Sequence, residues 1–396
     1  MRILIVDDDP DMLQLLSKFL HSWGHETVQA RDGQEAWSIL QQGEITFVIT
    51  DWLMPQMDGV TLCKKIRDEC CLGYVYVIIL TSKETKTDVI EGMTAGADDY
   101  VRKPFNKQEL KQRVRAGHRI LELQSELEEK NDQLSRAYKS IEKDLKVASK
   151  VQKSLLPRPS HLLSGVCFET FFQPCTFVAG DVYNYFELDD EQIGFYLLDV
   201  SGHGVASALL SVALSKLISP GTLQKNPHRQ PESEAQVYDL AEPARIVKFL
   251  NDSFQSDIDA FQYFTMVYGI IDLRRSRIRM CQAAHPQPIL VRAGEMVRPV
   301  EGSGFPVGLF PEVEYEETEL NFVAGDRLFI YSDGITECCN PSNVPFAERR
   351  LLQLLEKSRQ LTTRETLTTI HKELQAWRGK PSFDDDLSIL AIERVD

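Results

Sequence analysis

The stretch V-I-T-D-W-L-M-P-Q-M-D-G, residues 48–59, begins as an apolar, β-branched run and ends in an acidic turn with a glycine. Similar apolar runs occur at Ile3–Val6 and Val75–Leu80, with amphipathic segments at Met12–Leu20 and Val60–Cys70. Short strands that alternate with helices predict a doubly wound α/β domain with a parallel sheet. Ligands bind beyond the carboxyl ends of such strands, so the residues that follow each run are candidates for a site.

Residues suited to phosphoryl transfer stand at these strand ends. Asp7 and Asp8 follow the first run, Asp51 the second and Thr81 the third, and Lys103 precedes a proline further along. An aspartate that accepts a phosphoryl group needs a divalent cation, and Mg²⁺ prefers carboxylates, a carbonyl and water. An ammonium would take up further charge, and a hydroxyl would sense the product. A single aspartate at a strand end is more often a turn residue, but the ordered set predicts a phosphorylation site.

Four segments resemble the receiver domain of two-component response regulators: I-L-I-V-D-D-D, V-I-T-D-W-L-M-P-Q-M-D-G, I-I-L-T-S and G-A-D-D-Y-V-R-K-P-F. The resemblance covers essentially all of residues 1–118, and we place this domain at residues 1–119. It implies that Asp51 accepts a phosphoryl group from a sensor histidine kinase or a small phosphodonor. The Mg²⁺ ligands that it implies are Asp7, Asp8, Asp51 and the Leu53 carbonyl.

The receiver resemblance assigns roles to three further residues. Thr81 and Tyr100 would change rotamer on phosphorylation, and Lys103 would contact the phosphoryl group. None of the reacting positions departs from the family pattern. We therefore expect an active receiver.

Residues 120–156 lack glycine and proline and keep one unbroken heptad frame. Its d positions are Ile120, Leu127, Leu134, Ile141, Ala148 and Leu155, and its a positions are Gln124, Asn131, Tyr138, Leu145 and Gln152. This pattern predicts a coiled-coil linker helix. An asparagine at an a position fits a parallel homodimer, and amides in the seam weaken the coil enough for a switch. The alternative is a single long helix packed on its own domains.

Composition narrows the class of protein. The chain has 396 residues and a net charge of −15, which argues against nucleic-acid binding. Its eight cysteines include two adjacent pairs and no C-x-x-C spacing, which predicts reduced thiols and a cytoplasmic location. The sequence shows neither a signal peptide nor an apolar run of membrane-spanning length, so we expect no membrane association.

The remainder, residues 157–396, predicts an α+β sandwich with a metal site. Its β-rich runs are Ile193–Val200, Tyr263–Leu273, Arg327–Tyr331 and Leu387–Ile392. Its acidic signatures are A-G-D at 179–181, L-D-V-S-G-H-G at 198–204, Y-S-D-G at 331–334 and D-D-D-L-S at 384–388. Hard oxygen ligands favour Mg²⁺ or Mn²⁺ over zinc. Two such ions can deprotonate water and clamp an in-line attack on phosphorus.

These signatures resemble the metal-dependent protein phosphatases of type 2C (PPM), in the bacterial branch typified by RsbU and SpoIIE. The match runs from about Val147 to Ile392 and includes A-S-K-V-Q-K-S-L-L-P, A-A-H-P-Q-P and G-F-P-V-G-L. It implies a protein serine/threonine phosphatase in which Asp199 bridges two Mn²⁺ or Mg²⁺ ions near the Val200 carbonyl. The other implied residues are Asp181, Asp333 and Asp385 as metal ligands and His203 as the acid that protonates the leaving serine oxygen.

One run departs from the branch pattern G-G-D-x-x-D. It reads A-G-D-V-Y-N, so Asn184 stands where a carboxylate is usual and Ala179 where a glycine is usual. An amide can orient a metal-bound water but supplies no charge. The ligand in the last signature is also open, because Asp384 and Asp386 compete with Asp385, which we choose for its spacing to the following Leu-Ser.

The leading hypothesis is an enzyme in which phosphorylation of Asp51 shifts the helix of residues 120–156 and orders the phosphatase site. The resemblance implies that its substrate is a phosphorylated anti-sigma-factor antagonist. No residue of this sequence identifies that substrate directly. The alternative is a phosphorylation-controlled adaptor whose phosphatase fold only binds a partner. Asn184 favours the adaptor, and the four retained aspartates oppose it. The sequence does not give the sign of the control or the choice between Mn²⁺ and Mg²⁺.

Overall fold

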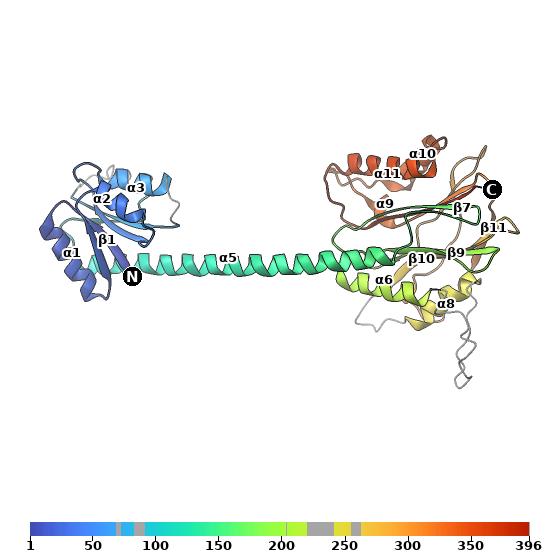
Figure 1. The fold of residues 1–396 in the computed structure, drawn as a ribbon, viewed down its shortest axis with the longest axis horizontal. Coiled ribbons are helices and arrows are strands. Elements are labelled where there is room, and N and C mark those ends of the chain that lie inside the picture. Colours follow the sequence, from blue (N-terminus) through green and yellow to red (C-terminus); the bar gives the residue numbers. More distant parts are fainter. Residues whose placement is uncertain (69–72, 83–91, 203, 220–240, 255–262, 396) are drawn as a thin grey trace, which may run out of the picture. The chain divides into compact units, whose positions relative to one another are not determined.

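The computed structural model describes residues 1–68, 73–82, 92–202, 204–219, 241–254 and 263–395. These residues form two compact units, Met1–Ser140 and Ile141–Asp396. In Figure 1 the first unit is coloured blue to cyan and the second green to red.

The first unit is built on one parallel sheet with the strand order β2-β1-β3-β4-β5. The elements are β1 (Arg2–Val6), α1 (Pro10–Ser22), β2 (Glu26–Ala30), α2 (Gly33–Leu40), β3 (Phe47–Asp51), α3 (Gly59–Asp68), β4 (Tyr76–Thr81) and β5 (Asp99–Arg102). The register sets Val6 beside Thr50. Asp7 and Asp51, one residue further along, therefore come together at the carboxyl edge. The predicted doubly wound α/β fold is confirmed.

Both faces of this sheet are buried, as is usual for parallel strands. Leu4 and Val6 join a core with residues of α2 and α3. Ile3 and Ile5 join a second core with residues of α1 and of the start of α5 (Lys107–Leu155). Packing on both faces fixes the strands, and with them the residues at their carboxyl ends.

Helix α5 contains the predicted linker and is longer than predicted. It spans 49 residues and begins at Lys107, well before Ile120, where the sequence predicts the linker to begin. Its first part groups with the first unit and its end with the second. All the predicted d positions are exposed, from 42% for Leu155 to 68% for Leu134. The linker is thus a continuation of the receiver's last helix, with an open apolar stripe.

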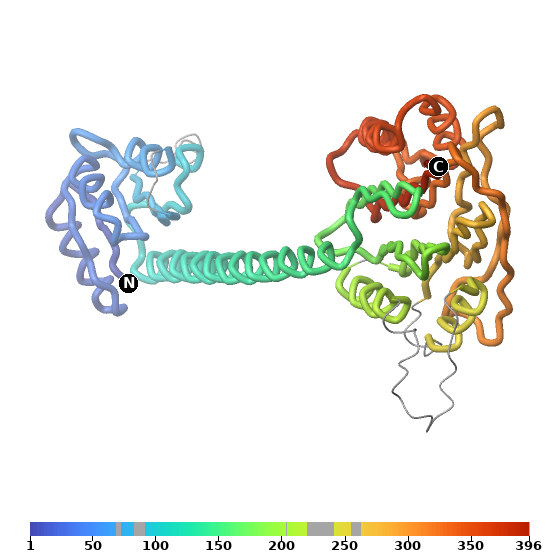
Figure 2. The backbone as a smooth tube through the Cα atoms, turned by 45° about the vertical axis from the view of Figure 1, so that its right-hand side comes forward, coloured from blue at the N-terminus to red at the C-terminus, as the bar shows by residue number. Residues whose placement is uncertain are grey.

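The second unit is a sandwich of two antiparallel sheets, and Figure 2 traces its backbone in green to red. The first sheet has the order β14-β11-β10-β9-β8, and the second has the order β13-β12-β15-β16-β7-β6. The strands of the first are β8 (Val182–Glu187), β9 (Gln192–Val200), β10 (Phe264–Asp272), β11 (Arg277–Ala283) and β14 (Glu317–Asn321). Those of the second are β6 (Ser160–Leu163), β7 (Val166–Gln173), β12 (Ile289–Val291), β13 (Arg298–Pro299), β15 (Arg327–Tyr331) and β16 (Leu387–Arg394). All the predicted β-rich runs are strands.

Helices cover the outer faces of the sandwich, with α6 and α8 on the first sheet and α10 and α11 on the second (Figure 1). Their bounds are α6 (Val205–Leu217), α8 (Pro243–Ser253), α9 (Asp333–Glu337), α10 (Ala347–Lys357) and α11 (Thr363–Arg378). One core lies between the sheets and one under each helical layer. The predicted α+β sandwich is confirmed. Among the described residues, no helix is both long enough and apolar enough to cross a membrane.

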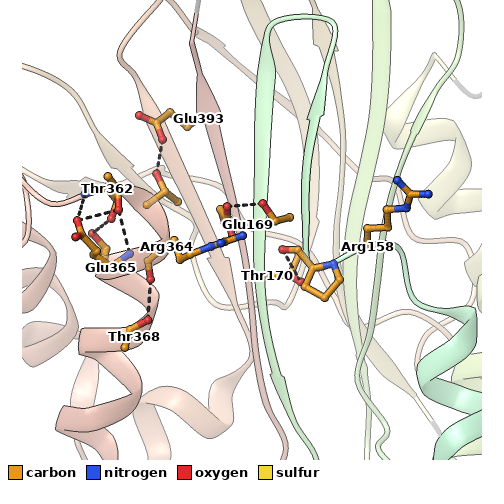
Figure 3. A network of polar contacts seen from close by, with 12 residues as sticks. Arg158, Glu169, Thr170, Thr362, Arg364, Glu365, Thr368 and Glu393 are labelled. Carbon is orange, nitrogen blue, oxygen red and sulfur yellow. Dashed lines mark hydrogen bonds and ion pairs between the residues drawn. The ribbon is translucent and has the colours of Figure 1, made fainter.

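A polar network fixes the N-terminus of α11 to the second sheet (Figure 3). The Thr362 hydroxyl accepts from the backbone N–H of Glu365, whose carboxylate accepts from the Thr362 N–H. Such a capping box contributes about 1 kcal/mol. From the same turn, Arg364 pairs with Glu169 on β7 at 3.3 Å. The network holds α11 against β7 in the second sheet.

Candidate functional site

Lys103 lies between two carboxylates at the carboxyl edge of the parallel sheet. Its Nζ is 2.8 Å from Asp7 Oδ2 and 2.6 Å from Asp51 Oδ1. Asp7 is 1% exposed. The backbone N–H of Lys103 donates to the Thr81 carbonyl oxygen at 2.7 Å, which places the lysine beside the end of β4. The structure thus brings together four of the predicted receiver residues.

The carboxylates of this cluster fit a divalent cation. One oxygen from each of Asp7, Asp8 and Asp51 lies within 4.8 Å of the others. Burial raises the pKa of Asp51, the hydrogen bond and charge of Lys103 lower it, and the charge of Asp7 raises it again. Three carboxylates facing one ammonium leave negative charge uncompensated, and Mg²⁺ prefers such oxygen donors.

The remaining predicted receiver residues differ in exposure. Thr81 is buried at the end of β4, whereas the side chains of Tyr100 and Leu53 are exposed by 38% and 57%. An exposed Tyr100 ring is free to change rotamer, as the predicted switch requires. Gly59 closes the loop that carries Leu53, because a Cβ on Gly59 would lie 2.1 Å from the Asp51 carbonyl oxygen. A larger residue in place of the glycine of the M-D-G sequence would therefore collide with the backbone.

A second acidic cluster gathers side chains from both sheets of the sandwich. Asp199 belongs to β9, and Asp181 directly precedes β8, its neighbour in the first sheet. Asp333 is the first residue of α9, just after β15, and Asp385 precedes β16 in the second sheet. The charges of Asp333 and Asp385 act on Asp199, and the charge of Asp199 acts on Asp181. The structure thus brings together the four aspartates that the sequence predicts as metal ligands.

Burial and mutual repulsion raise the pKa values in this cluster. Burial, followed by the charges of Asp333 and Asp385, raises the pKa of Asp199 to about 8. Burial, followed by the charges of Asp199 and Asp386, raises the pKa of Asp181 well above its usual value. Burial and the charge of Asp385 also raise the pKa of Asp333. Bound cations favour the charged form of such carboxylates, so the donor set fits divalent ions that prefer oxygen.

The three adjacent aspartates before β16 have different surroundings. Asp386 is 5% exposed, and its carboxylate accepts from two backbone N–H groups, one of them that of Gly180, both at 2.8 Å. The exposed Asp384 pairs with Arg378. Asp385 Oδ1 accepts from the Asp386 N–H at 2.8 Å. The charge of Asp385 acts on both Asp199 and Asp333, and this supports Asp385 as the ligand.

Gly180 packs against the end of β9. A Cβ on Gly180 would lie 2.9 Å from the Val200 carbonyl oxygen, closer than real side chains approach. The glycine therefore lets the A-G-D turn reach the Val200 carbonyl, a predicted metal ligand. His203, the predicted proton donor, lies outside the described residues.

Asn184, the departure from the family pattern, lies away from the four aspartates. It pairs with Tyr196 in the β8–β9 register, three positions beyond Asp181. At a rise of about 3.3 Å per residue, this is about 10 Å along the strand. Its Oδ1 accepts from the backbone N–H of Tyr185 at 2.9 Å.

Two serines support the cluster and were not predicted. Ser388 Oγ donates to Asp181 Oδ2 at 2.5 Å. Ser332 Oγ accepts from the Ser388 N–H at 3.0 Å and donates to the Asp386 carbonyl oxygen at 3.2 Å. Both serines stand inside the acidic signatures, in Y-S-D-G and D-D-D-L-S, and this position is a signal that could have identified them.

Gln152 at the end of α5 holds the backbone just before Asp181. Its side chain is 5% exposed. Nε2 donates to the Ala179 carbonyl oxygen at 2.7 Å, and Oε1 accepts from the Ala179 N–H at 3.0 Å. The sequence assigns Gln152 to the seam of a coiled coil, whereas the structure buries it against the A-G-D turn.

Two family models match the chain. The model of Stage II sporulation protein E (SpoIIE) matches residues 189–395, which is 207 of the 396 residues. The chain belongs to the SpoIIE family. The model of the response regulator receiver domain matches residues 3–115. This SpoIIE-family protein therefore carries an N-terminal receiver domain, as the motifs predict.

Individual relatives match one part of the chain each. The phosphoserine phosphatase RsbP of Bacillus subtilis (strain 168) is 28% identical over 202 residues, which is 50% of this chain and 46% of RsbP. The response regulator GtcR of Aneurinibacillus migulanus is 40% identical over 114 residues, 29% of this chain and 46% of GtcR. The chain thus spans about half the length of these curated relatives.

A solved structure shows the fold of the second unit. The SiaA-PP2C domain of Pseudomonas aeruginosa aligns with a TM-score of 0.54 at 22% identity, over 66% of this chain and 99% of that domain. At this identity the likeness concerns the fold alone. The second unit of this SpoIIE-family protein accordingly has the PP2C fold.

Proposed function

We propose that this protein is a response regulator in which phosphorylation of Asp51 controls a metal-dependent phosphoserine/phosphothreonine protein phosphatase. The observation that carries the enzymatic part is the convergence of Asp181, Asp199, Asp333 and Asp385 from two sheets. Repulsion between buried carboxylates opposes folding unless cations occupy the site. Strongly raised pKa values in such a cluster mark a functional site.

The donor set fits two Mn²⁺ or Mg²⁺ ions. Asp199 would be shared by both ions, with the Val200 carbonyl nearby, and Asp333 and Asp385 would complete the coordination of one. Asp181 would contribute directly or through water. Bound there, the ions would activate a water molecule and neutralise the phosphoryl oxygens during an in-line displacement.

Groups of the chain hold these ligands before a substrate arrives. The hydroxyl of Ser388 fixes one oxygen of Asp181, and Asp386 fixes the backbone at Gly180. Preorganised ligands need no rearrangement when the phosphoryl group binds, which lowers the barrier to the reaction. His203 would protonate the serine oxygen as it leaves.

The receiver would respond to a phosphoryl group on Asp51, donated by a sensor histidine kinase or a small phosphodonor. Its Mg²⁺ ligands would be Asp7, Asp8, Asp51 and the Leu53 carbonyl. Lys103 already pairs with Asp51, and it would form charge-assisted hydrogen bonds to the phosphoryl oxygens. The Thr81 hydroxyl would turn toward the phosphoryl group, and the Tyr100 ring would follow.

Helix α5 offers the route from the receiver to the phosphatase. It begins in the first unit and ends at Leu155, and Gln152 in its last turn holds Ala179 by two hydrogen bonds. A shift of this helix would move the backbone that carries Asp181. Phosphorylation would therefore act on the metal ligands through the A-G-D turn.

The exposed stripe of α5 supports a homodimer through this helix. Leu127, Leu134 and Ile141 are all more than half exposed in one chain, and Asn131 at an a position favours a parallel pair in register. Light scattering that finds only monomers, with and without a phosphodonor, would exclude this dimer.

We propose that the receiver domain spans residues 1–119, the linker residues 120–156 and the phosphatase domain residues 157–396.

The proposed substrate is a phosphorylated protein. RsbP, which matches half of this chain, is a phosphoserine phosphatase. The family resemblance favours a phosphorylated anti-sigma-factor antagonist, which would place the reaction in the cytoplasm.

A phosphorylation-controlled adaptor without catalysis is the second candidate. The observation that favours it is Asn184, which stands where a carboxylate is usual. Because Asn184 lies about 10 Å along β8 from Asp181, the replacement leaves the four clustered aspartates intact. The geometry therefore favours the enzyme.

The enzymatic proposal is tested by Mn²⁺-dependent phosphate release from a phosphoserine protein. We expect Asp199→Asn to lower the rate at least ~100-fold, because it removes the carboxylate shared by both ions. Asp190→Asn, an exposed aspartate in the β8–β9 turn, is the matched control and should leave the rate unchanged. Release that survives Asp199→Asn would refute the proposal.

A further inference from the structure

The chain crosses from one sheet of the sandwich to the other immediately after β11. This strand belongs to the first sheet, and the next strand, β12, belongs to the second. Ala284 turns the chain with a φ of 53°, a left-handed conformation that costs a non-glycine residue about 1 kcal/mol or more. Ala284 also bridges Met266 on β10. The strained turn delivers the next residue, His285 of the A-A-H-P-Q-P motif, into the interior.

His285 is a buried, neutral side chain at the crossing between the two sheets. It is 6% exposed, and its Nδ1 is 2.8 Å from Thr265 Oγ1 on β10. Burial lowers the pKa of His285 to about 3, against a weaker opposing effect of the backbone of Tyr331 on β15. The other ring nitrogen, Nε2, has no hydrogen-bond partner among the described residues.

The crossing at His285 joins the strands that lie beside two predicted metal ligands. Thr265 is paired with Asp199 across β10 and β9, so their Cβ atoms lie on one face, about 5 Å apart. Tyr331 ends β15, two residues before Asp333. His285 is thus one residue removed from Asp199 through Thr265. The strand that follows it, β12, pairs with β15, which leads to Asp333.

We propose that His285 is a positioning residue that anchors the crossing between the two sheets to β10 through Thr265 and so sets the spacing between Asp199 and Asp333. These carboxylates come from different sheets, so their separation depends on how the sheets are held together at this edge. The hydrogen bond between Ser388 and Asp181 is one such tie, and His285 is another. The inference rests on the proposed function, because it concerns the affinity of the phosphatase cluster for cations.

The test is Mn²⁺ binding to the metal-free full chain, measured by titration calorimetry. All proteins carry Asp8→Asn, which weakens the receiver's own cation site. We expect His285→Leu and Thr265→Val each to weaken Mn²⁺ binding ~10-fold or more, the range found when partners of metal ligands are removed. The double variant should bind no more weakly than either single variant, because both remove one interaction.

Two further variants separate the hydrogen bond from packing. His285→Asn keeps an amide near the position of Nδ1 and should bind Mn²⁺ within about threefold of the parent, by the same hydrogen bond. His371→Leu removes a histidine that packs on Phe171, away from this crossing, and should leave Mn²⁺ binding unchanged. Circular dichroism melts in EDTA verify folding, and Thr265→Val provides the test if His285→Leu does not fold.

The possible results have distinct meanings. Unchanged Mn²⁺ binding in folded His285→Leu and Thr265→Val would overturn the inference while leaving the proposed function intact. Equal weakening in His285→Asn and His285→Leu would also overturn it, because packing and not the hydrogen bond would be responsible. A parent protein that binds no Mn²⁺ at this site would contradict the proposed function itself, and with it the inference.

Discussion

The side-chain amide of Gln152 brackets the peptide of Ala179, with Nε2 2.7 Å from the carbonyl oxygen and Oε1 3.0 Å from the nitrogen. The next residue, Gly180, donates its N–H to Asp386, and Asp181 follows. The turn that carries Asp181 is therefore held by α5 on one side and by Asp386, the residue before β16, on the other. A helix that begins in the receiver thus contacts the backbone of the acidic cluster.

Removing the Gln152 amide should make phosphate release independent of phosphorylation at Asp51. Gln152→Ala leaves the buried N–H of Ala179 without a partner and its carbonyl with only the long hydrogen bond from Ser211 Oγ at 3.4 Å. We therefore expect the free energy of unfolding to fall by about 2 kcal/mol. Phosphate release should no longer change when an acyl-phosphate donor is added. Gln133→Ala, an exposed glutamine of α5, is the matched control and should retain the full response. A full response in Gln152→Ala would exclude this route of control.

Asp385 and Asp386 should respond differently to substitution. Asp385→Asn removes repulsion and a ligand, so Mn²⁺ binding should be lost while the metal-free protein remains at least as stable. Asp386→Ala leaves two buried N–H groups without acceptors and should lower the free energy of unfolding by about 3 kcal/mol. Urea denaturation in EDTA and Mn²⁺ titration measure both effects. The ligand assignment is wrong if Asp385→Asn still binds Mn²⁺ normally.

The metal-free protein should lose stability as pH rises. Asp199 titrates near ~3.9 when unfolded, and its pKa is about 8 in the folded protein. Between these values the folded state binds the extra proton, so the free energy of unfolding falls as pH increases. Melting temperatures in EDTA should therefore decline between about pH 5 and pH 8. Excess Mn²⁺ replaces the proton and should flatten the curve, as should Asp199→Asn. A melting temperature that rises with pH in EDTA would contradict this account.

The receiver site could be predicted from the sequence because its geometry follows from strand alternation. Asp7 and Asp51 end neighbouring parallel strands, and Lys103 follows another strand of the same sheet. Any folding that buries the apolar runs on both faces brings these ends together. The sandwich of the second unit could be predicted from its β-rich runs, all of which are strands.

The details of the phosphatase cluster could not be predicted, because they depend on contacts distant in sequence. The carboxylate of Asp386 accepts a hydrogen bond from Gly180, which lies 206 residues earlier. Spacing in the sequence does not distinguish Asp386 from Asp385. Heptad periodicity predicted the helix at residues 120–156. It could not distinguish a seam position from a docking position, so it gave no indication that Gln152 contacts Ala179.

The central claim is that Asp51 controls the phosphatase, and Mn²⁺-dependent phosphate release from a phosphoserine protein tests it most directly. The rate should be measured with and without an acyl-phosphate donor, in wild-type protein and in Asp51→Asn. We predict that the donor changes the wild-type rate and leaves the Asp51→Asn rate unchanged. The account is contradicted if the donor has no effect on the wild type, or if Asp51→Asn responds to the donor as the wild type does.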